Sequence, residues 1–327
     1  MKAVIIARAG GPGVLEIQDR PLPAPGAGQI RVRVRASALN RADLLQRAGN
    51  YPVPPGAPAD IAGMEYAGEV DSVGNGVLLW KKGDKVMGIV GGGGHAEFVT
   101  VHEREAMPVP AGMKWEDAAA IPEVFLTAFD ALFTRMSLRT GEILVIHAVG
   151  SGVGTAALQL AKLIGARVVG TARSADKLAR VKEMGLDVAI DAVDGNWAPQ
   201  IEAEIGHDAV NGVLDLVGGN YLDGNLRVAA LKGRIVVVGL TAGAMSQFNM
   251  GILLRKRLTI VGTVLRARPI EEKIELTRDF SARMIPLFEN GRLKPIVDRV
   301  LRFDQIADAH RLMESNATFG KIVLVWR

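Results

Sequence analysis

The stretch HAVGSGVGTAA, residues 147–157, has the composition of a loop that holds a phosphate group. Its alternating glycines permit a tight turn and let backbone N–H groups come close to a ligand. The usual dinucleotide pattern G-x-G-x-x-G fits in no register. Counted back from Gly154, its two earlier glycine positions hold Val149 and Ser151. An apolar run precedes the loop and an amphipathic run follows it, so a helix N-terminus would face the anion. The sequence therefore predicts a pyrophosphate site whose glycines are spaced differently from the usual pattern.

The end of the next apolar strand indicates which dinucleotide fits. NAD-specific folds place an Asp or Glu there, about 20 residues past the loop, on the ribose 2′-hydroxyl. Here the strand ends Gly170-Thr171-Ala172-Arg173-Ser174, without an acid. Arg173, Ser174 and Lys177 offer cations and a hydroxyl to a 2′-phosphate, which favours NADPH, although the nearby Asp176 slightly opposes it. The plainer alternative is that Ser174 only caps its helix and Lys177 lies in solvent.

Residue types that carry metal or covalent chemistry are sparse. The chain has no cysteine, which excludes thiolate catalysis and cysteine-bound metal. Its five histidines are scattered, and catalytic zinc needs three well-placed ligands, so we predict no metal site. His147 ends an apolar strand and is more typical of a core residue than of a base, while Glu65 is as readily structural as functional. What remains is hydride transfer from a nicotinamide to an acceptor that needs little activation, either an electron-poor quinone or an activated enone.

Composition places these motifs in a two-domain globular protein. A chain of 327 residues exceeds what one core usually holds, and 49% hydrophobic residues support large cores. Aromatic residues make up only 5%, which argues against single-strand nucleic-acid binding. The basic run 31–35 alternates Arg with Val like a solvated strand face. No segment approaches the ~20 apolar residues of a membrane span. The N-terminal apolar run is shorter than a signal-peptide core, so we expect a cytoplasmic protein without membrane partners.

Two patterns of elements follow one another along the chain. Residues 1–120 contain short strands broken by turns and prolines, which is typical of an irregular, mostly antiparallel β domain. From about residue 125, near-continuous apolar strands alternate with amphipathic helices, which indicates a parallel sheet covered on both faces. The expected strands are 142–148, 166–172, 187–191, 212–217, 234–240 and 258–264. Six such strands predict a doubly wound dinucleotide fold, so the expected fold class is α/β.

Local signals place several boundaries and loops. The helix after the phosphate loop should end at Gly165, and the next should begin with Ser174 as its N-cap and end at Gly185. The run Gly91–Gly94 predicts a flexible hairpin loop. The tail returns to short elements, with a strand at 321–326, which suggests that it rejoins the first domain.

Five segments together resemble the zinc-independent quinone oxidoreductases of the medium-chain dehydrogenase/reductase superfamily. They are most similar to the subgroup of the tumour-suppressor-inducible quinone oxidoreductase. The segments are SALNRADLLQRAGNYPVPPG (37–56), GMEYAGEV (63–70), HAVGSGVGTAALQLAK (147–162), LDLVGG (214–219) and GKIVL (320–324). The resemblance implies a GroES-like catalytic β domain, residues 1–124 and 267–327, and a Rossmann NADPH-binding domain, residues 125–266. It also implies an active site in the cleft between the two domains.

The chain departs from its relatives at three positions. The family's A-x-x-G-x-x-G loop maps to Ala148, Ser151 and Gly154, so Ser151 differs from the wider family while agreeing with the subgroup. Zinc-dependent relatives have G-H-E where this chain has Gly63-Met64-Glu65, and Met does not replace that histidine at zinc. Relatives often have a tyrosine where this chain has Ala192, and Arg173 offers a compensating grip on phosphate.

The resemblance also implies the site residues. Tyr51 would donate a hydrogen bond to the acceptor oxygen beside Asn40, or, alternatively, would only anchor a proline-flanked loop. The catalytic candidates are Tyr51, Asn40 and Ser151. The cofactor-binding candidates are Thr127, Ala148, Gly150, Ser151, Gly152, Val153, Gly154, Arg173, Ser174, Lys177, Leu240, Thr263, Val264, Leu265 and Asn316.

The sequence thus predicts an NADPH:quinone oxidoreductase that forms a homodimer through its edge strand, 258–264, because pairing would cover an exposed apolar edge. Two alternatives stay open. One is an enone or enoyl-thioester reductase on the same scaffold, and the other is a non-catalytic NADPH-binding protein with a structural or nucleic-acid-binding role.

Overall fold

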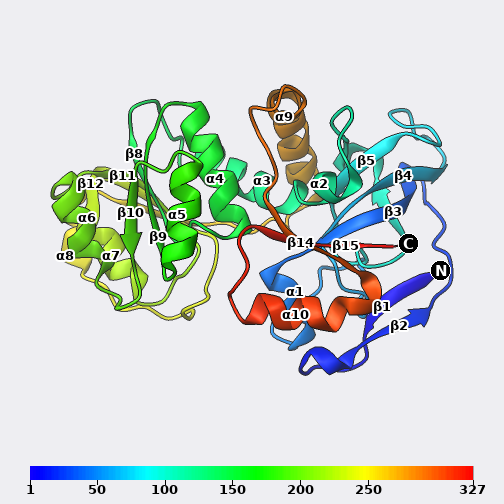
Figure 1. Cartoon of the computed structure of the whole chain (residues 1–327). Helices are drawn as coiled ribbons and strands as arrows, with labels where there is room; N and C mark the ends of the chain where they lie inside the picture. The colour runs from blue at the N-terminus through cyan, green and yellow to red at the C-terminus, as the bar shows by residue number, and fades with distance from the viewer. Residues whose placement is uncertain (327) are drawn as a thin grey trace. The chain divides into compact units, whose positions relative to one another are not determined.

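The computed structural model of the chain describes residues 1–326 and divides into two compact units (Figure 1). Unit 1 comprises Met1–Leu126 together with the segment from Leu265 onward, and unit 2 comprises Thr127–Val264. In the part of the chain described, no helix combines the length and apolar character needed to cross a bilayer.

Unit 1 is built on a sheet whose neighbouring strands are often distant in sequence. Its strands are β3 (Gln29–Leu39), β4 (Glu65–Val73), β5 (Lys85–Ile89), β6 (Phe98–His102), β7 (Ala106–Pro108), β14 (Val297–Arg302) and β15 (Lys321–Val325). The order is β14-β15-β3-β4-β5-β7, with β6 also paired to β3. β15 runs antiparallel to β3, so the C-terminal segment, red in Figure 1, completes a sheet begun near the N-terminus. A separate antiparallel pair joins β1 (Lys2–Ile6) and β2 (Leu15–Asp19).

The alternation of residues along β3 explains its two faces. Its valines are buried, whereas the arginines between them lie on the other face. Arg31 pairs with Asp71 at 2.6 Å and Arg35 pairs with Glu69 at 2.6 Å, both acids being on β4. The predicted strand face is confirmed, and its positive charge is balanced by the neighbouring strand.

Short helices and one long helix accompany the sheet of unit 1. They are α1 (Arg41–Arg47), α2 (Trp115–Ala119), α9 (Ile270–Glu289) and α10 (Ile306–Glu314). Helix α3 (Pro122–Phe129) follows α2 and leads into a π-helical turn, Asp130–Arg135. The apolar residues of α10 pack with those of β3 and β15 in one core.

The glycine run 91–94 is not the flexible hairpin loop that the sequence predicted. Gly92, Gly93 and Gly94 are buried, and the Gly91 carbonyl accepts a hydrogen bond from Arg266 Nε at 2.7 Å. A Cβ on Gly94 would lie 2.5 Å from the Glu65 carbonyl oxygen. The prediction was wrong because these glycines provide close backbone packing rather than flexibility.

Unit 2 is a parallel sheet of six strands. They are β8 (Ile143–Ile146), β9 (Arg167–Ala172), β10 (Val188–Asp191), β11 (Val210–Asp215), β12 (Ala229–Val237) and β13 (Thr259–Gly262), in the order β10-β9-β8-β11-β12-β13. The helices between them are α4 (Gly152–Leu163), α5 (Ala175–Glu183), α6 (Trp197–Ile205), α7 (Tyr221–Val228) and α8 (Met250–Lys256). The first strand, β8, lies in the middle and the chain winds outward from it in both directions, which confirms the doubly wound α/β fold.

The predicted helix ends in unit 2 are also confirmed. Gly165 follows α4 with φ +75° and Gly185 follows α5 with φ +94°, a left-handed conformation that favours glycine. The Ser174 hydroxyl accepts the Lys177 N–H at the start of α5. β13 is shorter than expected, so Thr263 and Val264 follow the strand rather than belonging to it.

Candidate functional site

The glycine loop forms a helix N-terminus directly after β8. Ser151 is the N-cap of α4, and its hydroxyl accepts the Gly154 N–H at 3.1 Å. A Cβ on Gly154 would lie 2.6 Å from the Ala148 carbonyl oxygen, so this turn requires glycine there. The N–H groups of Gly152 and Val153 have no acceptor among residues 1–326. These unpaired donors at a helix N-terminus fit a pyrophosphate group.

Ser151 therefore has a local role that the glycine pattern did not reveal. A serine side chain at the N-cap satisfies one N–H of the first helical turn, which glycine cannot do. Replacing the family's glycine by serine thus strengthens the start of α4 while leaving the first two N–H groups of that helix open.

The carboxyl end of β9 carries no acid, as the sequence indicated. Arg173 is exposed, and Ser174 caps α5, so the capping part of the plainer alternative is correct. Burial raises the pKa of the Tyr221 phenol, and the nearby Arg173 guanidinium opposes that rise. Arg173 thus lies close to the start of α7. This strand end therefore presents a cation and a hydroxyl and no acid.

The other candidates of unit 2 follow strands β12 and β13. Leu240 comes after β12 and is 55% exposed, and Val264 comes after β13 and is 49% exposed. Thr263 donates from its hydroxyl to Asp130 Oδ2 at 2.7 Å. Thr127 lies on α3 and is buried. Because the sheet is parallel, the carboxyl ends of its strands lie at one edge, where such folds bind ligands. The phosphate loop follows β8 at this edge, and Arg173, Leu240 and Thr263 come after β9, β12 and β13.

Two cofactor candidates belong to unit 1 instead. Leu265 is buried. Asn316 follows α10 with φ +56°, and its side-chain oxygen accepts from Arg41 Nη2 at 2.7 Å. The structure therefore brings the phosphate loop and the candidates that follow β9, β12 and β13 to one sheet edge, whereas Thr127 lies on α3 and these two residues lie in the other unit.

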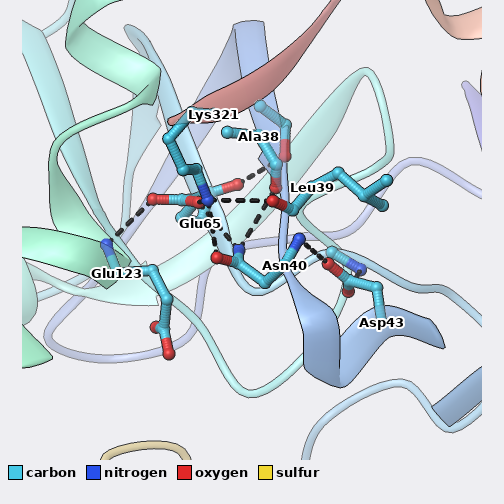
Figure 2. Close-up of polar contacts among 9 residues, drawn as sticks. Ala38, Leu39, Asn40, Asp43, Glu65, Glu123 and Lys321 are labelled. Carbon is cyan, nitrogen blue, oxygen red and sulfur yellow. Dashed lines mark hydrogen bonds and ion pairs between the residues drawn. The ribbon is translucent and has the colours of Figure 1, made fainter. Parts of the chain in front are cut away.

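Unit 1 contains a buried polar network around Glu65, shown in Figure 2. The Glu65 side chain is fully buried, and its Oε1 accepts from Lys321 Nζ at 2.7 Å and from Asn40 Nδ2 at 2.8 Å. Its Oε2 accepts the backbone N–H of Glu123 at 2.8 Å. Glu65, which the sequence left open, thus joins β4 to β15, to the start of α1 and to the start of α3 (Figure 2).

Lys321 satisfies all three of its ammonium donors inside this network. Besides Glu65 it donates to the Leu39 carbonyl at 2.9 Å and to Asn40 Oδ1 at 2.6 Å. The Asn40 amide is therefore held at both its nitrogen and its oxygen. The sequence analysis missed Lys321, although a lysine at the head of the apolar strand KIVLV was a usable signal, because a buried lysine requires a partner.

The residues at this position do not fit a zinc ion. Met64 is buried where zinc-dependent relatives have histidine, and the Glu65 carboxylate is occupied by Lys321 and Asn40. Within residues 1–326 no group of three or more His, Asp or Glu side chains is arranged to hold a metal ion.

Tyr51 lies beside two charged residues that the sequence analysis did not single out. The Arg266 guanidinium carbon is 5.1 Å from the centre of the Tyr51 ring, and Arg266 also donates to the Gln46 side-chain oxygen at 2.8 Å. Burial raises the pKa of the Tyr51 phenol, Glu123 adds to the rise, and Arg266 opposes it. Tyr51 thus lies near polar groups, and its roles as hydrogen-bond donor and as loop anchor both stay predictions.

His147 belongs to a second buried network, in unit 2. One ring nitrogen lies 2.9 Å from Thr171 Oγ1 and the other 2.7 Å from Asn225 Oδ1. Asn225 in turn donates to Asp215 Oδ2 at 2.9 Å. Burial lowers the pKa of His147, with Asp215 acting in the opposite direction. The interpretation of His147 as a core residue is confirmed.

Two family profiles match the chain. One is the alcohol dehydrogenase GroES-like domain, over residues 26–111, and the other is the zinc-binding dehydrogenase, over residues 152–287. A quinone oxidoreductase of Pseudomonas aeruginosa is 32% identical over 332 residues, which cover 99% of both chains. The mouse synaptic vesicle membrane protein VAT-1 homolog is 33% identical over 99% of this chain and 84% of its own length. The chain belongs to the quinone oxidoreductases of the medium-chain dehydrogenase/reductase superfamily.

Solved structures agree with this assignment. A mycobacterial protein complexed with NADPH superposes with a TM-score of 0.89 at 27% identity, over 100% of both chains. The JamJ enoyl reductase superposes with a TM-score of 0.88 at 25% identity, over 99% of this chain and 98% of the other. The fold is a GroES-like β domain with a Rossmann domain, and the protein is an oxidoreductase with an NAD(P)-binding fold that acts on small molecules.

Proposed function

We propose that the protein is an NADPH-dependent quinone oxidoreductase that transfers hydride directly to the quinone without a metal. The observation that carries this proposal is the Glu65–Lys321 pair, because Lys321 and Asn40 hold the carboxylate next to Met64, so the residues at this position do not fit a zinc ion. A simple ketone usually needs an electrophile at its oxygen, whereas an electron-poor quinone does not. The membership in the quinone oxidoreductase family supports the same acceptor class.

The proposed cofactor residues fall into three groups. Bound NADPH supplies the hydride, and the loop Ala148–Gly154 holds its pyrophosphate through the open N–H groups at the start of α4. Arg173, Ser174 and Lys177 hold the 2′-phosphate. The remaining contacts are assigned to Thr127, Leu240, Thr263, Val264, Leu265 and Asn316.

Each proposed substrate residue has a distinct task. Tyr51 donates its hydroxyl proton in a hydrogen bond to the acceptor oxygen and orients the ring. Asn40, whose amide is fixed by Glu65 and Lys321, shapes the wall against which the acceptor lies. Ser151 places the start of α4 and lies beside the cofactor.

A steady-state acceptor panel tests the proposed reaction. We expect NADPH oxidation with ortho-quinones at a higher kcat/KM than with enoyl thioesters or simple ketones. A rate seen only with enoyl thioesters would favour the second candidate, an enoyl-thioester reductase, which the likeness to the JamJ enoyl reductase supports. Tight NADPH binding without turnover of any acceptor would favour a non-catalytic role.

The cofactor preference has its own test. The double change Arg173→Gly with Lys177→Ala should weaken NADPH binding far more than NADH binding, since only NADPH carries the 2′-phosphate. Asp176→Asn serves as the control in the same turn and should leave the preference for NADPH intact. Equal losses for both cofactors would refute the phosphate assignment.

We further propose a cytoplasmic homodimer formed through β13, the edge strand of the unit 2 sheet. Val264 and Leu254, which flank this edge in sequence, expose large apolar side chains. Light scattering that returns a strict monomer at micromolar concentration would remove the dimer.

The proposed domain boundaries are 1–124 with 267–327 for the catalytic domain, and 125–266 for the NADPH-binding domain.

A further inference from the structure

The carboxyl group of Glu123 is fixed at its backbone and unpartnered at its oxygens. Glu123 lies in the first turn of α3, and its backbone N–H donates to Glu65 Oε2 at 2.8 Å. The side chain is partly buried, yet its carboxyl makes no hydrogen bond or ion pair with any of residues 1–326. In Figure 2 it points away from Glu65 and Lys321. This arrangement leaves the acid free to exchange a proton.

Charged groups from several elements act on the pKa of this carboxyl. They are Glu65 on β4, Lys321 on β15, Asp43 on α1 and Arg266 before α9. Burial, followed by the repulsion from Glu65, raises the pKa of Glu123 to about 8, although Lys321 and Arg266 act in the opposite direction. Glu123 is also the charged residue that most strongly raises the pKa of Tyr51. The charge of Glu123 therefore acts directly on the Tyr51 phenol.

We infer that Glu123 supplies the proton that accompanies hydride transfer to the quinone, an inference that rests on the function proposed above. The acceptor gains a hydride, which carries two electrons, and is left as a hydroquinone monoanion. The O–H bond of the Glu123 carboxyl then breaks as a new O–H bond forms on the anionic oxygen, giving the neutral hydroquinone. The Glu123 carboxylate recovers its proton from water.

Glu123 is a better acid for this step than Tyr51. A phenol has a reference pKa of ~10, and in Tyr51 burial raises the pKa further. A general acid works best when its pKa lies near the operating pH. Tyr51 therefore orients the acceptor oxygen, and Glu123 delivers the proton.

Stability separates a structural role for Glu123 from the role of an acid with a raised pKa. A charged acid in the first turn of a helix is stabilising, so neutralising it would lower stability. For a carboxyl whose pKa in the folded protein lies above its ordinary value of 4.5, the folded state binds the proton more tightly. Stability then falls as the pH rises from about 4.5 towards about 8. Glu123→Gln should remove this loss, so the variant should resist denaturant better than the wild type at alkaline pH.

The experiment combines kinetics, stability and direct titration. With NADPH and an ortho-quinone, kcat of the wild type should fall as the pH rises through about 8. Glu123→Gln should lower kcat about 100-fold, the lower end of the range for a general acid, with little change in KM and without that fall. Glu123→Asp should restore part of the rate together with the fall. Glu272→Gln, at an exposed acid in the first turn of α9, is the control and should match the wild type.

Difference infrared titration of the wild type against Glu123→Gln measures the carboxyl itself and does not depend on turnover. A carboxyl that titrates near pH 8 supports the inference, and one that titrates near 4.5 overturns it. Quinone turnover whose pH profile is the same in Glu123→Gln and the wild type would also overturn it, while leaving the quinone reductase function intact. The absence of turnover with every quinone would remove the proposed function, and the proton donation with it.

Discussion

Both units bury a carboxylate, but they stabilise it in different ways. In unit 1 the Glu65 carboxylate is met by the ammonium of Lys321, a full counter-charge, and by the Asn40 amide. In unit 2 Asp215 accepts the backbone N–H groups of Val217 and Gly218, each at 2.8 Å, with the Asn225 amide as a further donor. One network is an ion pair, and the other is a set of neutral donors.

The difference shows what each network positions. The ion pair joins β4 to β15 and fixes the Asn40 amide, and the second oxygen of Glu65 accepts the Glu123 N–H at the start of α3. The neutral network joins β8, β9, β11 and α7, so it fixes the ends of the strands that precede the phosphate loop and Arg173. Unit 1 thus uses a full counter-charge to fix a side chain beside its sheet, whereas unit 2 uses neutral donors to fix a strand edge.

The largest effect should come from breaking the ion pair. Lys321→Met leaves Glu65 buried without its counter-charge, which should cost about 3–5 kcal/mol in the free energy of unfolding. Adding Glu65→Gln should recover part of this loss, because the uncompensated charge is then gone. Denaturant unfolding measures both. Lys162→Met, which breaks the more exposed pair with Asp187, is the control and should cost about 1 kcal/mol or less.

A smaller loss should follow from disturbing the neutral network. In Asp215→Asn the amide nitrogen meets another donor, the Asn225 amide, so we expect a loss of about 1.5–3 kcal/mol. Asp194→Asn changes an acid that caps an exposed turn and should have almost no effect. If Asp215→Asn destabilises as much as Lys321→Met, the distinction between the two networks is lost.

The smallest effect separates structure from binding at the phosphate loop. Ser151→Ala and Ser174→Ala each remove an N-cap, so each should cost ~1 kcal/mol of stability, while Ser151→Gly should cost only a few tenths. If Ser151 also lies beside the cofactor, Ser151→Ala should raise the KM for NADPH and Ser151→Gly should raise it as well. Unchanged kcat and KM in Ser151→Gly would mean that the serine serves only as a cap.

Most of the fold of unit 2 was predicted from hydrophobic periodicity and from residues typical of helix ends. Gly165, Ser174 and Gly185 mark helix ends by local backbone chemistry, and local chemistry is readable from sequence. Gly91–Gly94 misled because a glycine run looks the same whether it is flexible or closely packed. Which applies depends on residues such as Arg266, which lies far away in the chain.

The candidate site also has parts set by local sequence and parts set by residues that are distant in sequence. The phosphate loop and the acid-free end of β9 are each one short continuous segment, so the sequence predicted where each lies in the fold. The group around Glu65, Lys321, Glu123 and Arg266 was not assembled, because its members come from four separated segments that only the folded sheet brings together. A buried lysine and an acid inside apolar runs are signals of such a cluster, but they do not name their partners.

The reaction proposed for the protein is direct, metal-free hydride transfer from NADPH to a quinone. Its most direct test is a single-turnover reaction in which the enzyme with bound NADPH, treated with a chelator, is mixed with an ortho-quinone. We predict one hydroquinone formed for each NADPH oxidised, at a rate that falls when the transferred hydrogen is replaced by deuterium. NADPH that stays reduced with the quinone but is oxidised by an enoyl thioester would contradict the claim.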